Sequence, residues 1–99
     1  MPEAARRGRL ALIASPDGSE GSTTIHQNAR VYTTLLGAGD RVAHPLAPGR
    51  RAWVQVARGR AALNGLGLGP GDGAAIEGEQ AIELVGQDAD AEALVFDLP

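Results

Sequence analysis

The side chains of this chain that could take part in chemistry are few. It has two histidines, His26 and His44, and no cysteine. A histidine can act as a general base or bind a metal, but either role needs a second group placed beside it. His26 lies in the run TTIHQN, with no serine, cysteine or acid beside it in the sequence. We therefore interpret His26 as a surface or hydrogen-bonded strand residue and assign no catalytic residue.

The run RRAWVQVA offers the other candidate group. In a strand, alternate residues share a face, which places Arg51, Trp53 and Gln55 together. Trp53 could serve as an aromatic platform and Arg51 as an anion clamp, with Gln55 and His44 completing a small binding pocket. The alternative is that Trp53 is a core residue and Arg51 lies at the rim. The opposite face carries only small or branched apolar residues, namely Ala52, Val54 and Val56.

Composition limits what can position these groups. Ninety-nine residues suit one domain with a modest core, and aromatic residues make up only 3% of them. Without cysteine the fold has no disulfides, which fits a reducing cytoplasm. No segment approaches the roughly 20 apolar residues of a membrane span. We expect a cytoplasmic protein with no membrane partner.

Charge is unevenly distributed along the chain. Residues 1–60 carry nine arginines and four acids, whereas residues 61–99 carry eight acids and no base. A basic half can indicate nucleic-acid binding, but lysine is absent and aromatic residues do not interleave with the arginines. We expect the two halves to neutralise each other within one barrel and predict no nucleic-acid partner.

The elements that must position the candidate residues read as short strands. Apolar runs alternate with turn signals such as Pro16-Asp17-Gly18 and Asn64-Gly65. This spacing predicts an all-β barrel or sandwich of 8–10 short antiparallel strands, without a helix. We assign residues 1–8 to a disordered or linker lead and residues 9–99 to a single domain. The expected strands lie in residues 9–15, 23–36, 41–46, 51–57, 60–63, 73–78, 81–85 and 91–98.

One motif occurs twice. Residues 36–43 (LGAGDRVA) and 68–75 (LGPGDGAA) share the pattern L-G-x-G-D-x-x-A. The second glycine of each copy allows positive φ, and the aspartate can bond back to the turn before a strand begins. Two equivalent turns imply two similar strand pairs, although such turns also recur by chance in a glycine-rich chain.

Several longer pieces together carry a family resemblance over residues 10–99. They are SPDG, HQNARVY, APGRRAWVQVARG, GDGAA and the terminal FDLP. With these pieces the chain resembles the C-terminal cupin of the pirin-like bicupins, a family associated with quercetin 2,3-dioxygenase activity. The resemblance implies a cupin double-stranded β-helix, or jelly-roll barrel. It also implies that a separate N-terminal half holds the metal, with three histidines and one glutamate.

The resemblance allows the metal-ligand positions to be checked in this chain. A cupin site needs two histidines one residue apart and a glutamate about four residues later on the same inward face. Counting back from the glycine that closes the strand, Arg51 falls at the glutamate position, with Pro45 and Ala47 at the histidine positions. A register shifted by one residue places His44 and Leu46 there instead. Neither register supplies two ligands.

The second cupin motif also lacks its metal ligand. Ile82 stands where the resemblance implies a further histidine, so we predict no metal and no cofactor. The resemblance also points Arg51, Trp53 and Gln55 into the barrel mouth, whereas periodicity alone would bury the valine face. We predict a non-catalytic structural or oligomerisation domain that forms a homodimer, through residues 9–15 and 23–32, or that pairs with a second cupin domain. The alternatives are a binding module for a small aromatic or anionic ligand and the accessory half of a dioxygenase-like bicupin.

Overall fold

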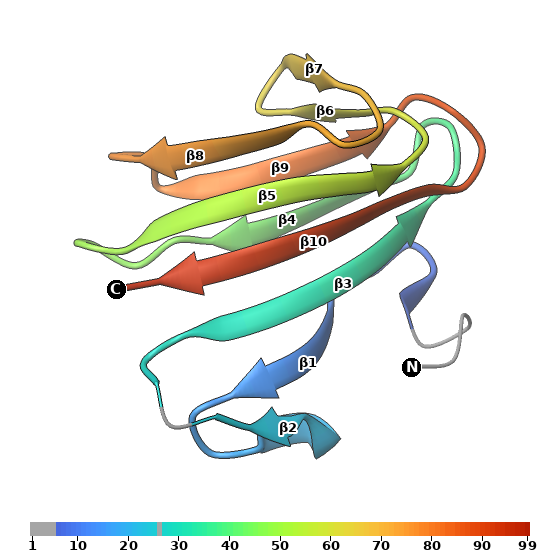
Figure 1. The fold of residues 1–99 in the computed structure, drawn as a ribbon. Helices are drawn as coiled ribbons and strands as arrows, with labels where there is room; N and C mark the ends of the chain where they lie inside the picture. Colours follow the sequence, from blue (N-terminus) through green and yellow to red (C-terminus); the bar gives the residue numbers. More distant parts are fainter. Residues whose placement is uncertain (1–5, 26) are drawn as a thin grey trace.

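The computed structural model describes residues 6–25 and 27–99, which form two sheets packed face to face (Figure 1). The larger sheet has the strand order β2-β1-β3-β10-β5-β8 and the smaller one β4-β9-β6-β7. In chain order the strands are β1 (Ala11–Ser15), β2 (Thr23–Thr24), β3 (Arg30–Leu36), β4 (Arg41–Pro45), β5 (Arg51–Arg58), β6 (Ala61–Leu63), β7 (Leu66–Leu68), β8 (Gly73–Glu77), β9 (Ala81–Gly86) and β10 (Ala91–Leu98). The all-β prediction is thus confirmed.

The two copies of the repeated motif form equivalent turns. In each copy the aspartate Oδ2 accepts from the first glycine N–H, at 2.9 Å for Asp40 and Gly37 and at 2.8 Å for Asp72 and Gly69. The second glycine has φ 84 in both copies, a value that a residue with a Cβ rarely adopts. Each turn leads into a strand, β4 or β8. Each turn carries the chain from one sheet to the other, from β3 to β4 and from β7 to β8, so the strands that it joins do not pair with each other as expected.

Three segments differ from the sequence expectation. Residues 66–68 form β7, a strand that was not among the expected runs. The run of residues 23–36 is divided into β2 and β3, and β2 pairs with β1 in parallel, not antiparallel, register. The lead of residues 1–8 was expected to lie outside the fold. Residues 1–5 are outside the described part of the chain, but Gly8 N–H donates to the Leu35 carbonyl at 2.7 Å. Residues 6–8 therefore lie against β3.

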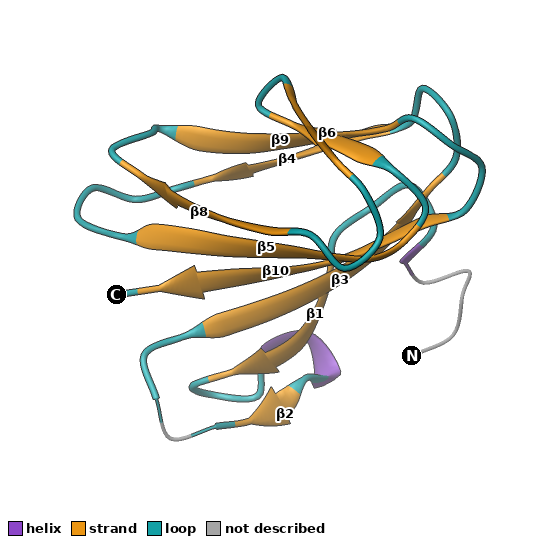
Figure 2. Cartoon of the chain, turned by 45° about the horizontal axis from the view of Figure 1, so that its top comes forward, coloured by secondary structure: helices purple, strands orange, loops and turns teal. Residues whose placement is uncertain are grey.

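The core lies between the two sheets, and in Figure 2 β9 and β4 form a layer over β5 and β10. Leucine, valine, isoleucine and alanine fill this space, as the low aromatic content predicts. Within the described residues, no helix is long and apolar enough to cross a membrane. The most deeply buried large side chains include Leu36, Val54, Val56, Ile82, Leu84 and Val95.

Candidate functional site

The strand β4 decides which of the two possible ligand registers is real. Val42 and Leu46 on this segment are buried, and His44, between them, is mostly buried and lies on the same face. His44 pairs across the sheet with Ile82 of β9, which is also buried. The register shifted by one residue is therefore correct. His44 points into the barrel, and Pro45 is exposed on the outer face.

A buried carboxylate at the end of β10 holds His44 in place. His44 Nε2 lies 2.8 Å from Asp97 Oδ2, and the two side chains are only 12% and 8% exposed. Arg50, from the loop between β4 and β5, donates its Nε–H to Asp97 Oδ1 at 2.6 Å. The same guanidinium donates to the Asp97 carbonyl at 3.2 Å. The three residues form one hydrogen-bonded unit that contains the Arg50–Asp97 ion pair, and we call it the Asp97 cluster.

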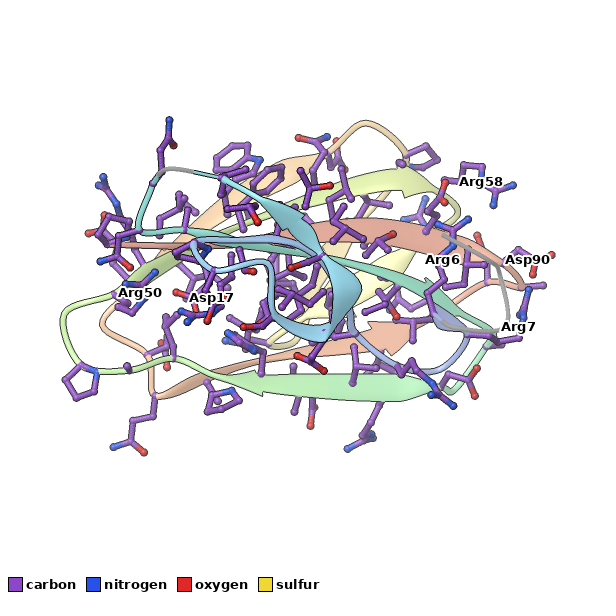
Figure 3. The ribbon with its side chains drawn as sticks, turned by 90° about the horizontal axis from the view of Figure 1, so that it is seen from below. Arg6, Arg7, Asp17, Arg50, Arg58 and Asp90 are labelled. Atoms are coloured by element: carbon purple, nitrogen blue, oxygen red, sulfur yellow. The ribbon has the colours of Figure 1, made fainter. Side chains whose placement is uncertain are left out.

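The Asp97 cluster joins several segments of the chain at one end of the barrel. Arg50 also donates to the side-chain and main-chain oxygens of Asn28, at 3.2 and 3.1 Å. The Tyr32 ring lies beside His44, with the two ring centroids 4.8 Å apart and the planes tilted by 52°. Strands β3, β4 and β10 and two loops therefore meet at this unit. Figure 3 shows Arg50 at this end of the molecule, opposite the end that carries Arg58.

Electrostatics keep the Asp97 carboxylate ionised. Burial alone would raise its pKa, but hydrogen bonds from Arg50 and His44, together with the charge of Arg50, lower the pKa below its ordinary value of 3.8. The pKa of Tyr32 is raised, first by burial and then by the charge of Asp97. With both Asp97 oxygens bonded and Arg50 donating to both Asp97 and Asn28, the cluster is suited to holding the segments at this end of the barrel together.

The surroundings of His44 do not suit a metal centre. Leu46 and Ile82, at two of the positions where a cupin would place ligands, have no donor atom and are buried. Among the residues that the structure describes, no three histidine, cysteine, aspartate or glutamate side chains converge. A divalent transition metal needs three or more such ligands. His26 lies outside the described residues.

The other three predicted binding residues lie on the outer face of the larger sheet, whereas His44 points from the smaller sheet into the space between the two. Ala52, on the neighbouring face of β5, is buried, whereas Arg51 and Trp53 are exposed. Gln55 is partly buried and accepts a 3.4 Å hydrogen bond from Trp53 Nε1. The resemblance pointed these residues into the barrel mouth, and the structure corrects that orientation, because the valine face fills the barrel. Periodicity alone gave the correct answer.

Trp53 nevertheless borders a groove on the outer face. The groove has a volume of about 310 Å³. It is predominantly apolar, and the Gln55 amide donates to the carbonyls of Gly71 and Asp72 at 2.9 and 3.2 Å. Arg51 is not among the lining residues and faces Glu77 at 3.7 Å. The groove is lined by Trp53, Gln55, Leu94, Phe96 and Leu98.

Sequence reasoning missed Asp97, Arg50 and Asn28, although signals for them existed. Arg50 has the same parity as Ala52, so the valine-face alternation already directs it inward. Asn28 and Asp97 fall in two of the pieces that carried the resemblance, HQNARVY and FDLP. Arg51 falls at the expected ligand position, but it is the preceding residue, Arg50, that contacts the buried Asp97.

With the geometry established, comparison with known proteins gives a consistent result. Residues 12–98 match the family described as the quercetinase C-terminal cupin domain. The quercetin 2,3-dioxygenase of Escherichia coli K12 is 41% identical over 88 residues, which are 89% of this chain and 38% of that protein. The chain therefore spans well under half the length of this curated relative.

Solved structures agree with the sequence comparison. The crystal structure of YhhW from Escherichia coli has a TM-score of 0.88 and 39% identity, covering 93% of this chain and 39% of that one. The structure of bacterial pirin YhhW in complex with nickel(II), also from Escherichia coli, has a TM-score of 0.85 and 40% identity. It covers 91% of this chain and 39% of that chain.

Proposed function

This chain belongs to the family of quercetinase C-terminal cupin domains, and from that premise we propose that it is a metal-free, non-catalytic structural half. Its partner is a second, metal-binding cupin domain in a quercetin 2,3-dioxygenase-like bicupin. The relatives named above leave about three fifths of their length unmatched by this chain. That length is enough for another domain of similar size.

The observation that carries this proposal is the set of residues that surround His44. This imidazole is bonded to Asp97 at 2.8 Å and lies opposite the buried Ile82. The aromatic ring of Tyr32 lies beside the imidazole, and it is not one of the ligands that a cupin metal site uses. Metal-dependent flavonol oxidation relies on a redox metal to activate dioxygen or the substrate, and a protein supplies position and shelter around it. The inward-facing residues around His44 are instead suited to holding this end of the barrel rigid.

Two measurements on the 99-residue chain test this proposal. Elemental analysis of protein purified without added metal should give far less than one iron, copper, nickel or zinc per chain. Loss of flavonol absorbance with each metal added in turn should match a boiled control. Near-stoichiometric metal, or metal-dependent turnover that His44→Ala abolishes, would contradict the non-catalytic role and make His44 a ligand.

A control variant separates metal binding from folding. Glu83→Ala removes an exposed carboxylate that pairs with Arg41 at 3.5 Å on the outer face of the sheet that carries His44. This variant should leave both metal content and turnover unchanged. If His44→Ala and Glu83→Ala lowered a measured activity equally, the activity would not arise at His44.

A further inference from the structure

The turn between β6 and β7 contains the only asparagine–glycine pair of the chain, Asn64-Gly65. The pair closes a hairpin in which Leu63 lies opposite Leu66. Its two residues have positive φ, 47 for Asn64 and 86 for Gly65, as a tight two-residue hairpin loop requires. Both are exposed, so water reaches them. Figure 1 shows this hairpin at the top of the molecule, beyond β9.

An asparagine followed by glycine can react with its own backbone. In this pair the Gly65 nitrogen, after losing its proton to a base, would bond to Asn64 Cγ, and the side-chain nitrogen would leave as ammonia. Water then opens the cyclic imide. Attack on one ring carbonyl gives aspartate, and attack on the other gives isoaspartate, whose backbone runs through the former side chain. Glycine favours ring closure because it has no side chain to obstruct the approach.

The fold holds the Asn64 side chain against β9. Asn64 Nδ2 donates to the Ala81 carbonyl at 3.3 Å, and Asn64 Oδ1 accepts from the Glu83 N–H at 2.7 Å. The Asn64 N–H donates to the Glu83 carbonyl at 2.9 Å. We call these three hydrogen bonds the Asn64 clamp. Closing the imide ring brings Cγ to the Gly65 nitrogen, so the carboxamide must first leave both of its partners.

The β6–β7 hairpin is a region where such opening needs little free energy. Strand β7 has three residues, lies at the edge of the smaller sheet and pairs there with β6. Leu66 at its start is 57% exposed, whereas Leu68 at its end belongs to the core. Short edge elements with few buried contacts open locally far more often than the whole fold unfolds. The clamp can therefore open while the rest of the barrel stays folded.

We propose that Asn64 is a modification site, which deamidates spontaneously through local opening of the β6–β7 hairpin and which the Asn64 clamp protects in the folded chain. The aspartate product has no N–H for the Ala81 carbonyl and places a negatively charged oxygen there. The isoaspartate product lengthens the backbone of a two-residue loop and shifts β7 against β6. Either product weakens the attachment of the hairpin to β9, so the first reaction makes later openings more frequent.

The rate of deamidation in the 99-residue chain tests the protection directly. The chain is incubated at mildly alkaline pH, folded or unfolded in guanidinium chloride, and peptide mass spectrometry quantifies both products. Asn64 should react at least about tenfold more slowly in the folded chain. Asn28, which is followed by alanine, is the internal control and should react slowly in both states. Equal rates for Asn64, or no reaction in the unfolded chain, would overturn the proposal.

Two core variants test whether the opening is local. Leu68→Ala removes a buried side chain of β7, and Val95→Ala is the matched control in the other sheet. With both variants folded, Leu68→Ala should speed the reaction at Asn64 about fivefold or more relative to Val95→Ala. If Leu68→Ala fails to fold, the wild-type rate is followed in denaturant below the unfolding transition, where it should change little. Equal acceleration by the two variants, or a rate that follows the unfolded fraction, would contradict local opening.

A mimic of one product tests the effect of the modification. Asn64→Asp removes the donor to Ala81 and should lower the melting temperature by about 4–8 °C. Gln80→Glu makes the same change from amide to carboxylate at an exposed residue before β9 and should leave the melting temperature unchanged. If Asn64→Asp melts at the same temperature as the wild-type chain, the clamp does not hold the hairpin and the proposal fails.

Discussion

The two faces of β10 carry apolar side chains of different size, and the larger ones point toward solvent. The face toward the other sheet carries the small residues Ala91 and Ala93, each 1% exposed, followed by Val95 and Asp97. The face toward solvent carries the larger apolar side chains Leu94, Phe96 and Leu98, all partly exposed. In an antiparallel sheet with one wet face, the apolar residues normally point to the core.

This difference indicates that β10 has two roles, one in the core and one on the outer surface. Small inward residues let the two sheets approach closely, so the core is closed by Val54, Val95 and the leucines of the smaller sheet. The larger outward residues lie outside that core and remain partly exposed. Their burial yields its free energy only when another surface covers them, at roughly 25 cal/mol per Å². The inner face makes the fold, and the outer face is available for assembly.

The largest effect should follow from breaking the inner face at Asp97. Asp97→Ala leaves Arg50 and His44 mostly buried without their carboxylate. Removing one partner of a buried ion pair typically destabilises a protein by about 3–5 kcal/mol, and we expect a loss near the lower end of that range. Urea unfolding followed by circular dichroism measures it. Glu83→Ala is the exposed control, and a loss under about 1 kcal/mol for Asp97→Ala would refute the fastening role.

Adjacent residues on opposite faces give the next largest difference. Val95→Ala removes a side chain that is fully buried between the sheets and should lower the free energy of unfolding by about 2 kcal/mol. Leu94→Ala removes a larger side chain, but in the isolated chain it should lower the free energy of unfolding by less than Val95→Ala does, since Leu94 is only partly buried. Equal losses would show that the outer face is already covered in the isolated chain.

Acid should produce a smaller and graded loss that also separates the two faces. The pKa of Glu92 is lowered from 4.5, chiefly by its hydrogen bond from Arg6, and that of Asp97 is lowered from 3.8. A lowered folded-state pKa stabilises the fold above the unfolded value, and this contribution disappears as pH falls through the folded value. Stability should therefore decline below about pH 4.5, first through Glu92 on the outer face and then through Asp97.

The variant Asp97→Asn tests the inner-face part of that decline. It should be less stable than the wild-type chain at neutral pH and should lose less stability between pH 4 and the acid limit. Stability against pH, measured by thermal unfolding in matched salt, distinguishes the two curves. Parallel curves would mean that Asp97 does not contribute to acid unfolding.

The sequence predicted the strands well because turns and alternation are local properties. The two Gly-Asp turns and the Asn64-Gly65 hairpin were correctly located. The described strands agree with the expected runs, except that β7 was not expected and residues 23–36 form two strands. Periodicity correctly placed the valine face of β5 inside, whereas the family resemblance pointed Arg51, Trp53 and Gln55 inward. For β10 both faces are largely apolar, so period-two alternation gives no clear choice between them. The valine face fills the barrel because small and branched residues fit the narrow space.

The candidate site was less predictable for a related reason. His44 was correctly identified as the inward residue of one register, but its partners Asp97 and Arg50 are 53 and 6 residues away in sequence. The packing of the smaller sheet, which carries His44, against the larger sheet brings His44 to Asp97, and the loop between β4 and β5 brings Arg50 there. Long-range contacts of this kind depend on topology, which no local pattern reports.

The central claim is that the inner face of the barrel holds His44 as part of the fold and not as a metal ligand. Calorimetric titration of nickel(II) into the 99-residue chain, beside His44→Ala, tests it most directly. We predict the same heats for both proteins, because His44 is bonded to Asp97 and lies opposite Ile82, which has no donor atom. One-to-one binding by the wild-type chain that His44→Ala abolishes would contradict the account.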